Sequence, residues 1–288
     1  MNQNIQMNNL NEKSAYRFDS ENHLHSFENK PLYGTSTVLG VVSKPLTYWA
    51  SGLAVQTLSG VKDCKVFTKL KNGKATETEI NELNGTVIDW LTKNKNISTK
   101  DYINLLGKAY TAHASTLKEK AEEGVDLHAE AERFVKNQIL LQPSGMIDTT
   151  EYDQKIKPFI DWSKANVDKF LFSEMHTYSD KHWLGGIVDC GVKLKNGEIA
   201  VIDFKSAKDA YNSHFWQIAG YAIQIEENGG FNADGVKTFE LEKPITQFIV
   251  FPFGAAKVEA KVSRRIEESK GAFLAALTIH KEKVATEN

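Results

Sequence analysis

The stretch that decides the fold is GGIVDCGVKL (residues 185–194), followed by KNG (195–197) and EIAVIDFK (198–205). Asn-Gly between two runs rich in β-branched residues is a strong signal for a β-hairpin. A two-residue turn would place Asp189 opposite Phe204. A three-residue loop, with Gly197 in the left-handed position, would instead place Asp189 opposite Asp203.

The three-residue loop is favoured because it separates apolar side chains from polar ones. It collects six residues on one apolar face: Val188, Cys190, Val192, Ala200, Ile202 and Phe204. A slip of one residue would mix the two faces of the hairpin, which burial of one face disfavours. We therefore expect the register of the longer loop.

This register gathers charged groups on the opposite face. Asp203 and Lys205 are two residues apart on a strand and point to the same side, and Asp189 lies directly across. Two carboxylates about 4 Å apart repel by roughly 4 kcal/mol at an effective dielectric constant near 20. A shared proton, Lys205 alone or a divalent cation could offset this repulsion. Carboxylate oxygens are the ligands that Mg²⁺ and Mn²⁺ prefer.

The hydrophobic pattern on either side of the hairpin predicts a mixed α/β fold. It indicates helices at 109–138, 152–170 and 207–227, strands at 172–178, 186–194, 198–205, 245–253 and 257–263, and a closing helix to about 281. We expect a loosely ordered lead-in at 1–33, a mainly helical arm at 34–110 with a break at Pro45, and the core domain at 111–288.

Composition narrows the function classes. The 288 residues carry a net charge of −2, so no global basic field indicates nucleic-acid binding. Residues 61–120 contain eleven lysines and seven acidic residues, which is either a solvated face or a phosphate-contacting surface. Two cysteines exclude a four-cysteine metal or iron–sulfur site. Without a signal peptide or an apolar run of about 20 residues, we expect a cytoplasmic protein that does not engage a membrane.

Three other positions can contribute to the acidic cluster. His128 and Glu132 are four residues apart on a predicted helix, so they share one face; a single helical histidine can equally be a surface or core residue. Glu174, on the first strand, is a further acid that could approach. Gln217 and Tyr221 also lie at i and i+4, either packing against the core or facing the cluster.

The Asp189…Asp203-Phe204-Lys205 pattern resembles the PD-(D/E)xK nuclease superfamily, and more narrowly its RecB-like branch. That branch combines Gly-x-x-x-His-x-x-x-Glu, Gly-x-x-Asp, Asp/Glu-x-Lys and Gln-x-x-x-Tyr. These stand here, in the same order, as Gly124/His128/Glu132, Gly186/Asp189, Asp203/Lys205 and Gln217/Tyr221. The stretch from Gly34 to Leu39, leading to Trp49, is similar to the N-terminal segment of phage-type exonucleases and of mitochondrial genome maintenance exonucleases.

The resemblance implies a restriction-endonuclease-like mixed sheet flanked by helices, with an N-terminal helical extension. His128, Asp189, Asp203 and the backbone carbonyl of Phe204 would hold Mg²⁺ or Mn²⁺, with Glu132 and Glu174 as possible further ligands. Lys205 would position or deprotonate the attacking water. Gln217 would orient the nucleophile or the DNA backbone, and Tyr221 would stack or hydrogen-bond near the scissile nucleotide. Thr35 and Ser36 would also contact DNA.

The implied activity is metal-dependent hydrolysis of DNA, as an exonuclease leaving 5′-phosphates in recombination, repair or phage DNA processing. Its partners would be single-stranded DNA or duplex ends, and a recombination protein. Some relatives carry an iron–sulfur cluster, which Cys64 and Cys190 cannot supply. Two alternatives remain: a structure-specific endonuclease, and a nucleic-acid-binding protein that keeps the fold without turnover.

Overall fold

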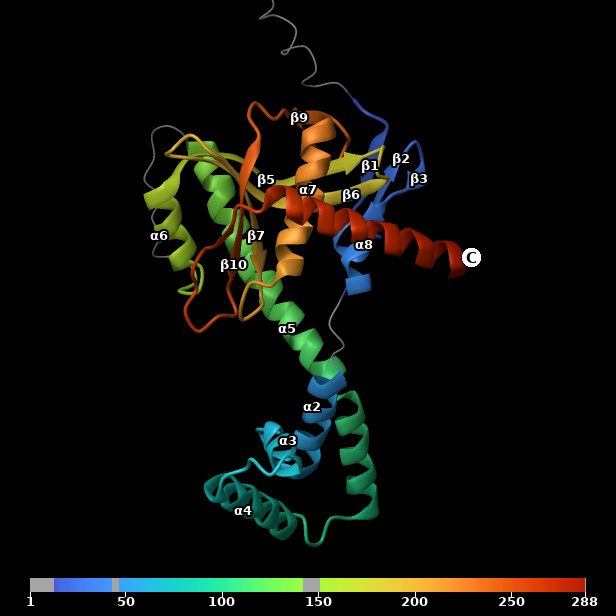
Figure 1. The fold of residues 1–288 in the computed structure, drawn as a ribbon, viewed down its shortest axis with the longest axis vertical. Helices are drawn as coiled ribbons and strands as arrows, with labels where there is room; N and C mark the ends of the chain where they lie inside the picture. Colours follow the sequence, from blue (N-terminus) through green and yellow to red (C-terminus); the bar gives the residue numbers. More distant parts are fainter. Residues whose placement is uncertain (1–12, 43–46, 142–150, 288) are drawn as a thin grey trace, which may run out of the picture. The chain divides into compact units, whose positions relative to one another are not determined.

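A computed structural model describes residues 13–42, 47–141 and 151–287 (Figure 1). The chain divides into two compact units, residues 1–43 with 123–288 and residues 44–122. The second unit is therefore an insertion within the first, and the arm is not an N-terminal extension. The predicted boundary at 110/111 is replaced by a continuous helix, α5 (Thr99–Leu141), whose N-terminal part belongs to the inserted unit.

The first unit is built on a mixed sheet with the strand order β11-β10-β7-β6-β5-β8-β9. Its strands are β5 (Val167–Ser179), β6 (Leu184–Leu194), β7 (Ile199–Lys205), β8 (Gly230–Phe231), β9 (Lys237–Phe239), β10 (Ile245–Pro252) and β11 (Lys261–Ser263), with β4 (Tyr33–Gly34) parallel to the start of β6. β5, β6 and β7 are antiparallel neighbours, whereas β10 runs parallel to β7. The mixed α/β class predicted from the sequence is confirmed.

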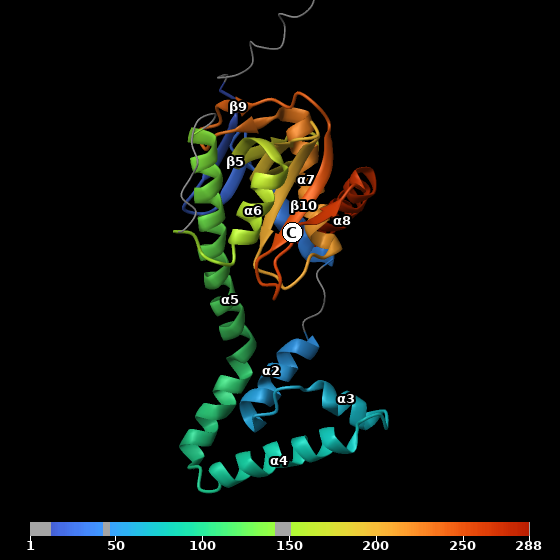
Figure 2. The same cartoon turned by 90° about the vertical axis from the view of Figure 1, so that its left-hand side faces the viewer.

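Helices cover both faces of this sheet (Figure 2). On one face lie α7 (Asn212–Asn228), α8 (Ile266–Glu287), α1 (Thr35–Val38) and the 3₁₀ helix η1 (Leu39–Val42), packed on a buried apolar cluster that includes Ile218 and Phe273. On the other face, the C-terminal part of α5 and α6 (Lys157–Asn166) pack on a second cluster that includes Phe134 and Phe159. The result is three layers, with the sheet in the middle.

Two of the predicted elements are shorter in the structure than expected. The helix expected to reach residue 170 ends at Asn166, because the β-rich run beginning at Val167 already pairs with Leu194 of β6. The strand expected at 257–263 is confined to Lys261–Ser263. The break expected at Pro45 falls between η1 and α2, but Pro45 itself lies outside the described residues.

Residues 13–33 are ordered, contrary to the expectation of a loose lead-in. They form a small antiparallel sheet of β1 (Tyr16–Asp19), β2 (Leu24–Phe27) and β3 (Lys30–Pro31). Tyr16 is fully buried and stacks on Tyr178. Its hydroxyl oxygen lies 2.7 Å from Nδ1 of His25. A few buried aromatic residues thus hold an otherwise polar segment against the main sheet.

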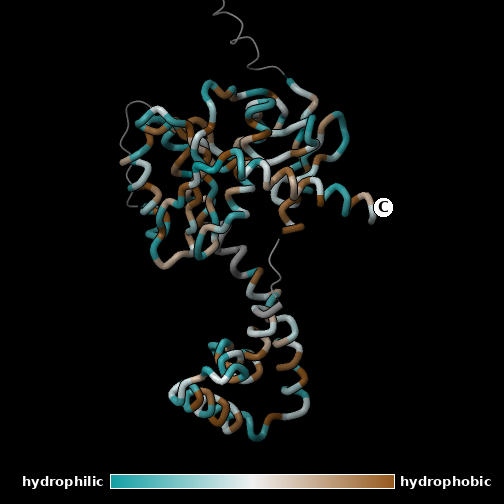
Figure 3. The backbone as a smooth tube through the Cα atoms, viewed as in Figure 1, coloured by the Kyte–Doolittle hydropathy of each residue, from teal (hydrophilic) through white to brown (hydrophobic). Residues whose placement is uncertain are grey.

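The inserted unit consists of α2 (Thr47–Ser59), α3 (Lys65–Lys71), α4 (Glu77–Lys93) and the N-terminal part of α5. A capping box between Thr76 and Glu79 starts α4. Hydrophobic residues recur along its helices (Figure 3), and several of them, including Ile88, Ile103 and Tyr110, are more than half exposed. None of the described helices of the protein has an apolar stretch long enough to cross a membrane.

The hairpin adopts the predicted three-residue loop. Cys190 pairs with Ile202, Val192 with Ala200, and Leu194 N–H donates to the carbonyl of Glu198, which leaves residues 195–197 as the loop. Gly197 has φ +84°, in the left-handed region. The predicted register is therefore confirmed as far as the Cys190–Ile202 pair.

The predicted side-chain direction is wrong for one residue of the hairpin. Val188 was expected on the same face as Cys190, but it packs in the cluster beneath α7, whereas Cys190 packs beneath α5 and α6. The β6–β7 ladder ends at the Cys190–Ile202 pair, and Asp189 bonds to the Phe204 N–H through its side chain. Side-chain alternation along β6 therefore changes phase at Asp189.

We expect Gly197→Ala to lower the free energy of unfolding by about 1–2 kcal/mol, because alanine is strained at this positive φ. Space is not the cause, since a Cβ at residue 197 would meet nothing within 4 Å. Gly271→Ala, in α8 of the same unit and also without a neighbour within 4 Å, should instead stabilise by about 0.5–1 kcal/mol. Urea unfolding of both variants measures the difference. A neutral or stabilising Gly197→Ala would contradict the loop assignment.

Candidate functional site

The candidate site lies where β6 and β7 part. Asp189 comes from β6, Asp203 and Lys205 come from the end of β7, and Glu174 comes from β5. His128 and Glu132 reach the same place from the C-terminal part of α5. The sequence placed these residues on four separate segments, and the fold brings them together.

Asp189 holds the parting strands together. Its Oδ2 accepts a hydrogen bond from the backbone N–H of Phe204 at 2.7 Å and lies 3.0 Å from His128 Nε2. Its side chain is only 10% exposed. A carboxylate with two such donors is fixed in orientation, since charge-assisted hydrogen bonds are the stronger kind.

His128 lies between two carboxylates. Its Nε2 faces Asp189, and its Nδ1 lies 3.7 Å from Oε1 of Glu174. Burial opposes the charged imidazolium, but the bond to Asp189 and the charges of Asp189, Glu174 and Asp203 outweigh burial and raise the pKa of His128 to about 9. Without a bound cation, a protonated His128 therefore compensates the acidic cluster.

Asp203 and Lys205 form a buried pair. Lys205 Nζ lies 2.9 Å from Oδ1 and 2.8 Å from Oδ2 of Asp203, whose side chain is 2% exposed. Only the contact with Oδ1 has hydrogen-bond geometry, so within the described residues Oδ2 has no hydrogen bond. Burial raises the pKa of Asp203 despite the nearby ammonium. Burial also opposes the ammonium, but the charges of Asp203 and Asp189 outweigh it and raise the pKa of Lys205.

Glu174 is held under strain. Its backbone has φ +47°, in the left-handed region where a residue other than glycine is uncommon. Its Oε1 is buried and, within the described part of the chain, accepts no hydrogen bond. Burial and the charge of Asp189 raise the pKa of Glu174 to about 7. Strain together with an unsatisfied buried carboxylate oxygen indicates a functional position.

Several of these donors suit a hard divalent cation. One ligand atom each from His128, Glu132 and Glu174 lies within 4.8 Å of the others. Asp189 contacts His128, and Asp203 offers an oxygen without a hydrogen bond. Oxygen-rich donor sets with one imidazole accommodate Mg²⁺ or Mn²⁺.

Comparison of the sequence with models of known protein families, and with curated proteins, found no match. The chemistry of the site therefore rests on its own geometry.

Gln217 and Tyr221 lie along α7 beside this cluster. Gln217 Nε2 donates to the Tyr221 hydroxyl at 2.8 Å. Tyr221 is buried, and burial and the charges of Asp203 and Asp189 raise its pKa, so its hydroxyl stays neutral. A Cβ on Gly186 would lie 2.6 Å from the Tyr221 ring, so glycine at 186 lets the ring sit against β6.

The remaining predicted site residues occupy different positions. The Phe204 ring lies in the core beneath α5, and its backbone passes between Asp203 and Lys205. Ser36 is exposed on α1. Thr35 is buried: its hydroxyl donates to the Gly185 carbonyl at 3.1 Å and accepts from Gln224 at 2.7 Å. This network joins α1, β6 and α7, so the predicted contact between Thr35 and DNA does not fit its position.

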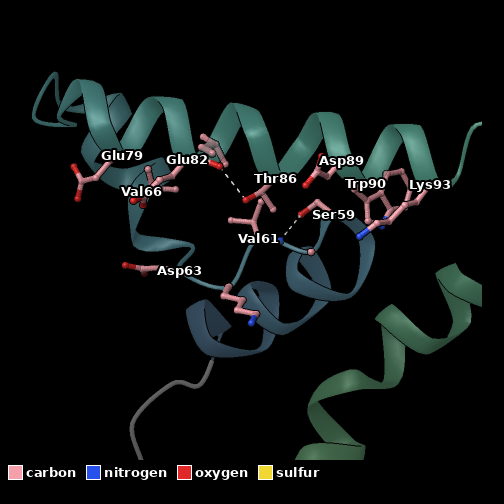
Figure 4. Close-up of a pocket in the computed structure, with 13 residues that line it drawn as sticks. Ser59, Val61, Asp63, Val66, Glu79, Glu82, Thr86, Asp89, Trp90 and Lys93 are labelled. Atoms are coloured by element: carbon pink, nitrogen blue, oxygen red, sulfur yellow. Dashed lines mark hydrogen bonds between the residues drawn. The ribbon is translucent and has the colours of Figure 1, made fainter.

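A hollow lies within the inserted unit, between α2, α3 and α4 (Figure 4). It has a volume of about 730 Å³, and its lining includes Asp63, Glu82, Asp89, Trp90 and Lys93. None of the residues that the sequence predicted for the site lines it.

Glu174→Gln should stabilise the metal-free protein increasingly as the pH rises. The folded-state pKa of about 7 lies above the ordinary 4.5, so between these values the folded chain retains a proton that the unfolded chain releases. Wild-type stability therefore falls as pH rises through this window, and glutamine removes that loss. Unfolding free energies in EDTA between pH 4 and 8 measure it. Glu242→Gln, at an exposed glutamate of the same unit, should parallel wild type, and a parallel Glu174→Gln curve would contradict the prediction.

Proposed function

We propose that this protein is a divalent-metal-dependent nuclease that hydrolyses phosphodiester bonds of DNA, acting as an exonuclease. The observation that carries the proposal is the convergence of His128, Asp189, Asp203 and Lys205 at the point where two strands part. Three independent chain segments supply these groups. We further propose that the sheet with its flanking helices is a restriction-endonuclease-like core, which fits the β5–β6–β7 meander followed by α7 and the parallel strand β10.

The residues present fit a metal ion. A buried Asp203 oxygen without a hydrogen bond and the unsatisfied Oε1 of Glu174 both belong to the cluster, and both are oxygen donors. His128, Asp189 and Asp203 would hold Mg²⁺ or Mn²⁺, together with the backbone carbonyl of Phe204 and, in reach of His128, Glu132 and Glu174. Such an ion polarises a phosphate oxygen and lowers the pKa of a bound water.

Lys205 has the position of a charge-stabilising group. Its ammonium is fixed by Asp203 and remains protonated, because the neighbouring carboxylates raise its pKa. A fixed cation beside the phosphate stabilises the negative charge that develops in the transition state. Asp203 orients this ammonium and shares the site with it, which explains why the two residues are separated by one position on the strand.

Gln217 and Tyr221 provide neutral hydrogen-bonding groups on α7. Because the Gln217 amide donates to the Tyr221 hydroxyl, the phenolic proton is available to another acceptor. A neutral donor can bind a phosphodiester or the attacking water without adding charge to the cluster. The chemistry of these two residues therefore matches an anionic substrate.

Two alternatives use the same fold. A structure-specific endonuclease would have the same site and would differ only in how DNA reaches it. A non-catalytic DNA-binding protein has no need of a buried Asp–Lys pair and a strained glutamate, both of which lower stability. Because this arrangement lowers stability, we favour a protein that uses it for catalysis.

Linear DNA labelled at either end, and covalently closed circular DNA, should distinguish these functions. We expect cleavage of linear DNA in Mg²⁺ or Mn²⁺, 5′-phosphate products and no cleavage in EDTA. Asp203→Asn and Lys205→Met should each lower the rate at least about 10²-fold, since each removes a charged group from the reacting phosphate. Asp234→Asn and Lys243→Met, at exposed positions of the same unit, are the matched controls. Cutting of circles would favour the endonuclease, and binding without cleavage the non-catalytic protein.

Metal binding has a readout that is independent of DNA. Mn²⁺ at saturating concentration should raise the Tm of the wild-type protein, because a ligand that binds only the folded state stabilises it by mass action. Asp203→Asn should lose most of this shift while remaining folded, whereas Asp234→Asn should keep it. An equal shift in wild type and Asp203→Asn would place the cation elsewhere.

A further inference from the structure

Helix α7 carries a third polar residue in line with Gln217 and Tyr221. His214 precedes Gln217 by three positions and Tyr221 by seven, so the three side chains share one face of the helix. The Tyr221 end of this row feels the charges of Asp203 and Asp189, and the His214 end feels the charge of Lys205. Both ends of the row are therefore within electrostatic reach of the candidate site. His214 was not among the residues predicted from the sequence, although its i, i+3 spacing to Gln217 is visible there.

The His214 ring is held in one orientation. The ring Nδ1 accepts a hydrogen bond from the backbone N–H of Tyr211 at 3.2 Å, and the backbone N–H of His214 donates to the Tyr211 carbonyl at 3.0 Å. The Tyr211 ring meets the imidazole edge-on, with the ring centroids 5.4 Å apart. Because Nδ1 is the acceptor, a neutral His214 carries its proton on Nε2.

The ring is neutral at physiological pH. Burial and the Lys205 ammonium lower the pKa of His214 to about 4, and Asp209 opposes them only partly. His214 therefore offers one N–H donor and no charge. Within the described residues, Nε2 makes no hydrogen bond to protein, and the ring is only half-buried.

Capping of α7 does not explain a histidine here. An N-terminal turn needs only an acceptor for the Tyr211 N–H, which a shorter polar side chain supplies. Histidine adds a second polar atom on the far side of a fixed ring. His214 shares the helix face of Gln217 and Tyr221, and the charge of Lys205, which suits an anion, acts on its ring.

We propose that His214 is a substrate-binding residue whose Nε2–H donates to a phosphate oxygen of the bound DNA strand, beside Lys205. This inference rests on the proposed nuclease function and extends it to a residue outside the resemblance. A neutral donor binds the phosphate without competing with the carboxylates for a cation. The contact exists before and during the reaction, so its loss should weaken substrate binding more than turnover.

Two substitutions separate the two nitrogens of the ring. His214→Asn keeps an oxygen near the position of Nδ1, so it can still accept the Tyr211 N–H, but it lacks the distal donor. His214→Gln places an amide N–H near the position of Nε2 and gives up the bond to Tyr211. A purely structural histidine predicts that asparagine is tolerated and glutamine is harmful, and a substrate-binding histidine predicts the opposite for activity.

Steady-state cleavage of linear DNA in Mg²⁺, with Tm measured for each variant, tests the inference. We expect His214→Asn to raise KM about 10- to 100-fold, the effect of one hydrogen bond to a charged group, with kcat within about twofold and Tm unchanged. His214→Gln should keep KM within about fivefold of wild type and lose a few degrees of Tm. A wild-type KM in His214→Asn would overturn the inference, as would equal increases in KM in both variants.

DNA with a single methylphosphonate provides an independent measurement. The substitution removes one anionic oxygen, so at the contacted linkage it should weaken the wild type and have little further effect on His214→Asn. Additive losses at every linkage would overturn the inference. Failure of wild-type protein to cleave DNA in any divalent metal would instead contradict the proposed function itself, which keeps the two failures distinct.

Discussion

The hydrogen bond from the Phe204 N–H to the Asp189 carboxylate is the interaction on which the site depends. The β6–β7 ladder stops one pair earlier, so this buried N–H would otherwise lack a partner, at a cost of about 1–3 kcal/mol. A side-chain oxygen takes the place of a main-chain carbonyl and holds the two strands at the point where they separate. The other charged groups of the site come from the segments that surround this point.

This side-chain hydrogen bond in place of a main-chain one also explains why the side-chain alternation of β6 changes phase. On the N-terminal side of Cys190, β6 no longer pairs with β7, and Val188 packs on the α7 side of the sheet instead of the α5 side. On the neighbouring strand β5, Glu174 also departs from regular strand geometry, with a positive φ. Backbone strain of this kind costs about 1–3 kcal/mol, and the well-packed clusters on both faces supply the rigidity that maintains it. The acidic cluster is therefore preorganised by the surrounding core.

The charged neighbours then fix the orientation or shift the pKa of individual groups in the site. Asp189 is fixed by two donors, Asp203 is fixed by Lys205, and the pKa of Glu174 is raised to about 7 by burial and Asp189. His128 bridges two acids and carries the compensating proton in the absence of a cation. A site with this many mutually dependent charges suits a ligand that replaces the proton with a stronger positive charge. A metal ion is such a ligand, which is the reason for the nuclease proposal.

The sequence by itself determined the hairpin register as far as the Cys190–Ile202 pair, because burial of one face allows only one alignment of alternating side chains. The 3.6-residue period likewise placed His128 with Glu132, and Gln217 with Tyr221. Only the tertiary structure decided the phase change at Val188, the burial of Thr35, the insertion of residues 44–122, the strain at Glu174 and the alignment of His214 with the acidic cluster. These depend on contacts between segments far apart in the chain, such as Thr35 with Gln224 and Tyr16 with Tyr178, and local periodicity contains no information about such contacts.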